Sequence, residues 1–269
     1  MEDELIFCFH SETKGRFFYS FMLAFIVQAR VGSTRLPNKI LLPFFKGKSI
    51  LELLISKLKN IEDAKVILAT STNKENDILE QIARQNGVLC FRGAENDVIQ
   101  RFIDAAEEYG VNNMIRVCSD NPFLELSSIR ELVHCAKDSN NDYISFNIGG
   151  VPSIKTHYGF WTEFVKLDAL KKVALLTDEQ LYHEHVTNYI YTHPDMFSIK
   201  WIDGPSILDT HPEIRLTIDT KEDFDNVKQI YSEICEKNEY PTITDVVKYL
   251  DAHSMFYASM RNQIKQNNK

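Results

Sequence analysis

Short runs of apolar residues alternate with segments of helical periodicity along most of the chain from Leu23 onward. Continuous apolar runs of roughly four to eight residues are typical of strands buried on both faces, and their alternation with helices is typical of a parallel sheet. The sequence therefore predicts an α/β protein with a Rossmann-like, mostly parallel sheet flanked by helices. We expect strands at residues 23–27, 65–70, 88–91, 113–118, 143–147 and 214–218.

Capping signals define where several helices begin and end. A serine followed three residues later by a glutamate is typical of a capping box, and this pattern occurs at Ser49 with Glu52 and at Ser128 with Glu131. Glycine is typical of the position just after a helix. We expect helices from residue 49 to 58, at 75–86, 97–109 and 128–137, around 163–176, from 220 to 234 and at 244–250.

The regular alternation breaks down between Gly149 and Asp209, where prolines and aromatic residues are frequent. We expect residues 149–209 to form a small inserted subdomain, or dimerisation arm, within a single domain at 22–250. The tail at 251–269 is polar after Ser259, and we expect it to fray. Residues 1–21 open with acidic residues, unlike a secretory signal. We expect them to be a disordered extension, with Met22 as the natural start.

Composition excludes several classes of function. The 269 residues are 44% hydrophobic and 25% charged, which is typical of a globular protein. A net charge of −8 argues against a nucleic-acid partner. The one long apolar run, at 17–27, is too short to span a bilayer. We therefore expect no membrane among its partners. Five cysteines without a C-x-x-C pair indicate free thiols, so we expect a cytoplasmic protein.

The loop directly after the first expected strand, QARVGSTRLPNK at residues 28–39, concentrates cationic and hydroxyl side chains around one glycine. Ligands of open α/β sheets bind at the carboxyl ends of the strands. Arginine forks, hydroxyls and exposed backbone N–H groups donate to several anionic oxygens at once, as a polyphosphate requires. The loop contains no G-x-G-x-x-G, and Leu42 replaces the first glycine of a P-loop ahead of Gly47. A solvated basic turn is the alternative.

Two further strand ends carry aspartates. Asp120 precedes Pro122 after the strand at 113–118, and Asp219 follows the strand expected at 214–218. Carboxylate oxygens facing a basic loop are typical of a magnesium site for a nucleoside triphosphate. The alternatives are a turn residue for Asp120 and a helix N-cap for Asp219. Asp223 fits the first turn of the following helix.

These segments resemble a known family. QARVGSTRLPNK, FRGAENDVIQRF, RVCSDNP, YHEHVTNYI and RLTIDTKEDF occur in order across about residues 23–235. They are similar to the CMP-sugar cytidylyltransferases that act on acylneuraminate or 3-deoxy-manno-octulosonate, and most of all to the members of spore coat polysaccharide biosynthesis. The resemblance implies a fold of the nucleotide-diphospho-sugar transferase type, whose small subdomain serves dimerisation and sugar binding. It also implies a homodimer.

The resemblance assigns roles to particular positions. It implies catalytic roles for Lys39, Arg30 and Asp219, and Mg²⁺ coordination by Asp120 and Asp219. His185 and Arg215 are candidate sugar contacts, with a structural role as the alternative. Ser119 stands where the family usually has a glycine. The candidate nucleotide contacts are Ala29, Arg30, Gly32, Ser33, Arg35, Lys39, Arg116 and Ser119, with Asp97 and Arg101 near the nucleotide or the sugar.

The implied reaction couples CTP to an acidic sugar and gives a CMP-sugar and pyrophosphate. A glycosyltransferase that uses a nucleotide-sugar is one alternative, although Asn121 and Pro122 after Asp120 exclude a D-x-D motif in this loop. A non-catalytic nucleotide-binding protein of the same fold is the other. The residues leave open which acidic sugar is used, and the base rests on the resemblance.

Overall fold

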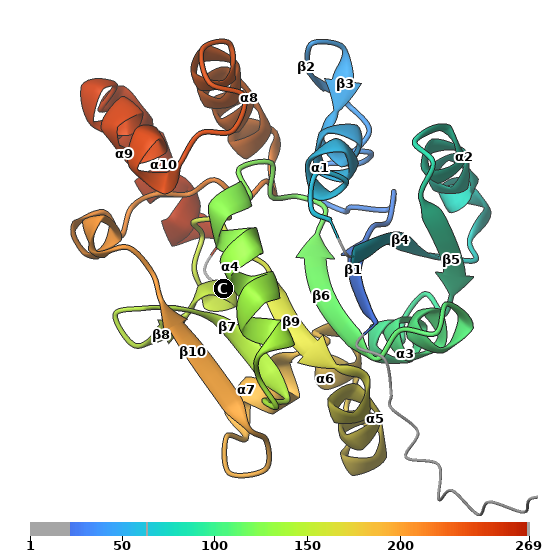
Figure 1. Ribbon diagram of the computed structural model, residues 1–269. Helices are drawn as coiled ribbons and strands as arrows, with labels where there is room; N and C mark the ends of the chain where they lie inside the picture. Colours follow the sequence, from blue (N-terminus) through green and yellow to red (C-terminus); the bar gives the residue numbers. More distant parts are fainter. Residues whose placement is uncertain (1–21, 63, 268–269) are drawn as a thin grey trace, which may run out of the picture.

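In the computed structural model, which describes residues 22–62 and 64–267, the described chain is built around one mixed sheet of eight strands (Figure 1). The extension expected at 1–21 lies outside these residues. The strand order is β10-β7-β9-β6-β1-β4-β5, and β8 pairs with β7. The sheet strands are β1 Leu23–Gln28, β4 Ala64–Ser71, β5 Leu89–Gly93, β6 Asn113–Cys118, β7 Tyr143–Ile148, β8 Val151–Pro152, β9 Glu163–Lys166 and β10 Ile199–Asp203.

Most neighbouring strands run parallel, which confirms the predicted class of sheet. β1 pairs in parallel with both β4 and β6, while β4 pairs in parallel with β5 and β10 with β7. β9 is antiparallel to β6 and to β7, and β8 is antiparallel to β7. The mixed character therefore comes from strands in the half of the chain whose pattern was least regular. A separate two-stranded hairpin is formed by β2 Pro43–Phe45 and β3 Lys48–Ser49.

Helices cover both faces of the sheet, and β1 shows why (Figure 1). Successive side chains of a strand point to opposite faces. Ala24 and Ile26 join one core, with the helices at 98–108 and 167–176, whereas Phe25 and Val27 join another, with the helices at 50–58, 126–137 and 221–235. The helices are α1 Ile50–Leu58, α2 Asp77–Gln85, α3 Val98–Glu108, α4 Leu126–Lys137, α5 Leu167–Leu176, α6 Gln180–Glu184, α7 Asn188–Thr192, α8 Lys221–Cys235, α9 Ile243–Ala252 and α10 Met255–Gln266, with 3-10 turns η1 Lys74–Asn76, η2 Ser153–Lys155 and η3 Ser206–Thr210.

One of the two predicted capping boxes is confirmed and the other is wrong. Ser49 and Glu52 form the reciprocal hydrogen bonds of a capping box at the start of α1. α4, however, begins at Leu126 with Glu125 as its N-cap residue, and the Ser128 hydroxyl bonds to the Glu125 carboxylate. The backbone N–H of Glu125 is fixed by the carbonyl of Phe160, so the first turn forms two residues earlier than the pattern suggests.

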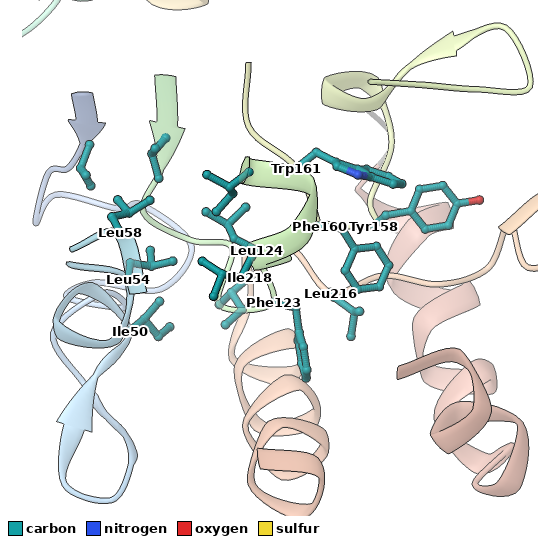
Figure 2. Packing of buried hydrophobic residues seen from close by; sticks show 14 of the residues in the cluster. Ile50, Leu54, Leu58, Phe123, Leu124, Tyr158, Phe160, Trp161, Leu216 and Ile218 are labelled. Atoms are coloured by element: carbon teal, nitrogen blue, oxygen red, sulfur yellow. The ribbon is translucent and has the colours of Figure 1, made fainter. Parts of the chain in front are cut away.

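The strand expected at 214–218 is absent from the described sheet. Ile214, Leu216 and Ile218 are fully buried in the core with α1 and the 123–124 segment, as Figure 2 shows for the last two. This burial produces the alternating pattern that resembled a strand. The backbone of the segment bonds to loops instead, since the N–H of Leu216 donates to His157 and that of Ile218 donates to Asp120.

Three other expectations about elements change. Residues 163–166, expected as helix, form β9, while 199–203 form the unexpected strand β10. Both strands belong to the main sheet although they lie within 149–209. The polar end of the chain does not fray within the described residues, because α10 buries Phe256, Tyr257 and Met260. No described helix is both long enough and apolar enough to cross a bilayer.

Candidate active site

The loop after β1, the loop after β6 and the segment at 214–220 meet at one edge of the sheet, and Lys39 joins them. The Lys39 ammonium lies 2.9 Å from Asp120 Oδ2 and 3.8 Å from Asp219 Oδ1, and it donates to the carbonyl of Ile218 at 2.5 Å. Its side chain is 12% exposed. One cation therefore bridges both aspartates that the sequence singled out.

A left-handed turn sets the position of Lys39. The preceding residue, Asn38, has a φ of 60°, and its N–H donates to the carbonyl of Val31 at 3.2 Å. Asparagine adopts this conformation more readily than most residues because its short polar side chain can bond locally. Ile40, which follows, is buried in the core. The turn thus directs Lys39 inward, although it lies in a segment rich in exposed residues.

Asp219 is held from two sides by arginines. Arg35 Nη2 lies 2.8 Å from Asp219 Oδ1, and Arg215 Nη2 lies 2.9 Å from Asp219 Oδ2. Arg35 is half-exposed, while the Arg215 side chain is 0% exposed. Asp219 is therefore not the N-cap of α8. That role belongs to Thr220, which forms a capping box with Asp223.

A cavity of about 650 Å³ opens beside this cluster and is lined by Arg35, Arg116, Lys155, His185 and Asp219, among others. Its lining carries more positive than negative side chains. Pockets for small ligands typically measure about 300–1,000 Å³. The cavity is therefore large enough for a small anionic ligand next to the Lys39 cluster, and it contains His185, the expected sugar contact.

Arg116 is fixed in this cavity by a buried network that the sequence pattern did not reveal. Its Nη1 lies 2.7 Å from Glu163 Oε2, and two of its nitrogens donate to Gln28 Oε1. Glu163 also accepts hydrogen bonds from the hydroxyls of Tyr143 and Thr187. Burial and the adjacent Glu163 carboxylate raise the pKa of Tyr143 well above its usual value, so the phenol stays a donor.

The sequence over most of the chain shows which family it belongs to. A cytidylyltransferase family model matches residues 24–261. The chain belongs to the cytidylyltransferase family. The protein is therefore a CTP-dependent nucleotidyltransferase, and the resemblance carried by the sequence motifs is confirmed.

Known relatives agree with this assignment. The cytidylyltransferase is 31% identical over 221 residues to the spore coat polysaccharide biosynthesis protein SpsF of Bacillus subtilis (strain 168), covering 80% of this chain and 88% of the relative. Its structure is similar to a cytidylyltransferase from Leptospira borgpetersenii, with a TM-score of 0.76 and 26% identity over 87% of this chain and 96% of that chain.

A more distant structure shares the fold. CMP:2-keto-3-deoxy-manno-octonic acid synthetase, solved in complex with CTP, has a TM-score of 0.59 and 13% identity over 78% of this cytidylyltransferase and 98% of that chain. At this identity the likeness shows the fold alone.

The rest of the basic loop is arranged around its own backbone. Ala29 is buried and its N–H donates to Ala69, while the N–H of Ser33 donates to Val31 at 2.8 Å. Gly32 is exposed. Arg30 forms an ion pair of 3.6 Å with Glu184 of α6, and both side chains are half-exposed. The assignment of these four loop residues, with the buried Ser119 after β6, to the nucleotide stays a prediction.

Asp97 and Arg101 of the cytidylyltransferase hold the loop ahead of α3. Asp97 accepts from the N–H of Gln100 as the N-cap residue, and it lies 2.9 Å from His183 Nδ1. The buried Arg101 donates to the carbonyl of Ala94 at 2.5 Å. The hydrogen bond to Thr177, assisted by Asp97, raises the pKa of His183. Asp97 and Arg101 therefore both stabilise the local structure, and their role in nucleotide binding stays a prediction.

Arg215 lies beneath the site instead of facing the cavity. Its guanidinium bonds to Asp223 Oδ1 at 2.7 Å, to Asp219 at 2.9 Å and to His157 Nδ1 at 2.6 Å. A side chain with 0% exposure cannot contact a sugar in this arrangement. The structural alternative for Arg215 is the one that the geometry supports, because it anchors Asp219. Sequence reasoning gave no role to Lys155, Asn188 and Tyr191 of the cavity lining. Asn188 lies within the motif YHEHVTNYI, whereas Lys155 and Tyr191 lie outside the quoted motifs.

Proposed function

We propose that this cytidylyltransferase transfers CMP from CTP to a hydroxyl of an acidic sugar and releases pyrophosphate. The observation that carries the proposal is the convergence of Lys39 and Asp120 on Asp219, which itself lines a cavity with a cationic lining. A carboxylate-bearing sugar is attracted to such a lining by charge, and a nucleoside triphosphate is attracted to the adjacent basic loop.

In the proposed reaction a sugar hydroxyl oxygen attacks the α-phosphorus of CTP. The bond from that phosphorus to the oxygen that bridges it to the β-phosphate breaks, pyrophosphate leaves, and the hydroxyl proton is released to water. Catalysis of such a transfer consists mostly of alignment and of neutralising charge. The Lys39 side chain is 12% exposed, and its ammonium is held by Asp120, the carbonyl of Ile218 and Asp219. Its charge is therefore already in a fixed position when phosphate oxygens bind.

The donor set at the site fits Mg²⁺. Asp120 and Asp219 offer carboxylate oxygens on either side of Lys39, with 30% and 17% of their side chains exposed. Among the described residues no cluster of three or more metal-ligating side chains exists. Mg²⁺ tolerates this, because it is usually held by one or two carboxylates while water and phosphate oxygens fill the other positions. When bound, it would stabilise negative charge on the phosphates.

Arg35 and Arg116 would orient the two substrates. Arg35 is half-exposed beside Asp219, so its guanidinium can reach phosphate oxygens. Arg116 is 8% exposed, and Glu163 fixes its direction. A rigid guanidinium fork suits a carboxylate, since two parallel hydrogen bonds form at once. We therefore place the sugar carboxylate on the side of Arg116, near His185, and the triphosphate on the side of Arg35 and Lys39. This gives Arg116 to the sugar, whereas the resemblance implies a nucleotide contact for it.

A pyrophosphate-release screen tests the proposal. All four nucleoside triphosphates are combined with several 2-keto sugar acids and with uncharged sugars as controls. We expect release with CTP and a sugar acid. Pyrophosphate release that is equally efficient with a neutral acceptor would contradict the acidic-sugar assignment. The family match favours nucleotidyl over glycosyl transfer, so products should be a CMP-sugar and pyrophosphate.

A further inference from the structure

A second cavity, of about 470 Å³, lies between the β2–β3 hairpin, α1 and the end of α8. Figure 1 shows the hairpin beyond the start of α1 and beside α8. The cavity shares no lining residue with the candidate active site. Its aromatic lining comes from Phe45, Tyr231 and Tyr240. Its volume falls in the range of about 300–1,000 Å³ that small ligands occupy, so it can hold an aromatic molecule.

Positive charge predominates in the lining. Lys46, Lys48, Lys57 and Lys237 line the cavity together with two glutamates. Glu236 lies 3.5 Å from Lys46, so these two charges offset each other. Three lysines then face the one remaining carboxylate of the described lining, Glu239, which interacts with Tyr240. An anion entering the cavity therefore meets more unneutralised positive than negative charge.

Lys57 connects this cavity to the loop that carries Asp120. Its side chain is 5% exposed, and its ammonium donates to the carbonyls of Pro122 at 3.2 Å and Leu124 at 2.7 Å. An ammonium has three N–H donors, so one is left for a ligand. Burial lowers the pKa of Lys57 to about 8 despite the neighbouring Cys235 and Glu125. A bound anion would relieve this cost of burying the positive charge.

We propose that this cavity is a binding site for a small aromatic anion, with its ring between Tyr231 and Tyr240 and its anionic group against Lys57 and Lys48. The ring is stabilised by burial against the aromatic walls, and the anionic group by a charge-assisted hydrogen bond. Because Lys57 holds two carbonyls just after Asp120, an occupant that attracts Lys57 shifts this loop. The effect of this shift on catalysis rests on the proposed function.

Binding is measured with 8-anilinonaphthalene-1-sulfonate, a fluorescent aromatic sulfonate, on the full chain. Ser56→Trp places an indole in the cavity from an exposed position of α1, and Lys48→Glu reverses one charge. Lys248→Glu, an exposed lysine that does not line the cavity, is the matched control. We expect one saturable site in the wild type, with affinity reduced about tenfold or more by Ser56→Trp and severalfold by Lys48→Glu.

Equal probe affinity in the wild type, Ser56→Trp and Lys48→Glu would overturn the site, and so would a crystal structure with the probe seated elsewhere. Pyrophosphate release then tests the connection to Asp120. We expect the probe to change the rate in the wild type but not in Ser56→Trp. If the probe binds the wild type but changes the rate of neither the wild type nor Ser56→Trp, the connection to Asp120 is overturned and the binding site is retained. Absence of release in every protein counts against the proposed function, and fluorescence still decides the site.

Discussion

Lys39 and Asp120, which lie 81 positions apart in the sequence, form an ion pair of 2.9 Å in the structure. The same ammonium lies 3.8 Å from Asp219, so a single residue joins the basic loop to both acidic segments. Like charges on two nearby carboxylates repel each other, and a cation between them offsets this repulsion. The contact therefore places Lys39 where incoming phosphates and the two aspartates would compete for its charge.

Replacing Lys39 tests its contribution to turnover. A fixed charge-assisted contact in a site of this kind contributes about 3 kcal/mol to the transition state, so Lys39→Ala should lower kcat by about a hundredfold or more. Lys248→Ala, which removes an exposed lysine on α9, is the control and should leave kcat unchanged. Near-normal turnover of Lys39→Ala would remove Lys39 from the proposed mechanism.

Replacing Asp219 tests the metal assignment. Asp219→Asn keeps the shape of the side chain but removes the negative charge that binds a cation. We expect the magnesium concentration for half-maximal rate to rise by about tenfold or more, because one of two carboxylate ligands loses its charge. Asp225→Asn, on the exposed face of α8, is the control. Superimposable magnesium titrations for Asp219→Asn and the wild type would be incompatible with the assignment.

Asp223 links stability to acid pH. Burial alone would raise its pKa, but the hydrogen bonds and charge of Arg215, with the N–H groups of Asp219 and Thr220, lower the pKa below its usual value. The resulting stability is present above the ordinary carboxyl pKa and is lost as the pH falls through the lowered one. Asp223→Asn should reduce the free energy of unfolding at pH 7 by about 3 kcal/mol, because it leaves Arg215 without its buried partner.

Urea unfolding at neutral pH and at about pH 3 measures this difference, which should shrink in acid. Asp245→Asn is a matched control, because Asp245 occupies the same capping-box position in α9 without a buried arginine. It should cost only about 1 kcal/mol. Equal losses in the two variants would show that the cap, and not the pair with Arg215, accounts for the effect.

Lys57 links stability to alkaline pH, and its contribution also rises with pH. Burial lowers its pKa from 10.5 to about 8. Between these values the unfolded chain binds more protons than the folded one, so this residue makes stability rise with pH in that window. The free energy of unfolding of the wild type minus that of Lys57→Met should therefore increase between pH 8 and about pH 10, by up to roughly 3 kcal/mol.

The difference between the two proteins isolates Lys57, because all other titrating groups are shared. Denaturant unfolding of both proteins at several pH values gives the measurement. A difference that stays flat or decreases across this window would show that the Lys57 ammonium is not penalised by burial.

Exposed leucines in the region expected to mediate dimerisation allow a test of the homodimer. The side chains of Leu175 and Leu181 are 88% and 52% exposed. Light scattering after gel filtration should give twice the mass of the chain, and Leu175→Glu should shift it toward the monomer, because burying a charge at an apolar contact is costly. Met255→Glu, at a position 71% exposed on α10, is the control. A monomeric wild type would contradict the expectation.

The sequence alone determined the fold class and the segments that make up the site. Apolar runs between capping signals are local features, and they located β1, β4, β6 and β7, which are mostly buried, as well as the partly buried edge strand β5. The basic loop and Asp120 follow buried strands, and Asp219 follows a buried segment with a similar apolar pattern, so all three were recognisable from the local sequence. Most of the sheet and the two acidic positions therefore followed from residues near one another in the chain.

Tertiary structure decided which side chains point into the cavity and which lie beneath it. Arg215 and Asp219 stand four positions apart in one motif, yet the arginine is 0% exposed and holds the aspartate in place. The apolar pattern at 214–218 reports burial but not hydrogen-bonding partners, so it could not distinguish a strand from a buried loop. Glu163 gave no signal, because its partner Arg116 lies 47 positions away. Burial leaves a local trace in the sequence, whereas pairing between distant groups depends on where the whole chain brings them.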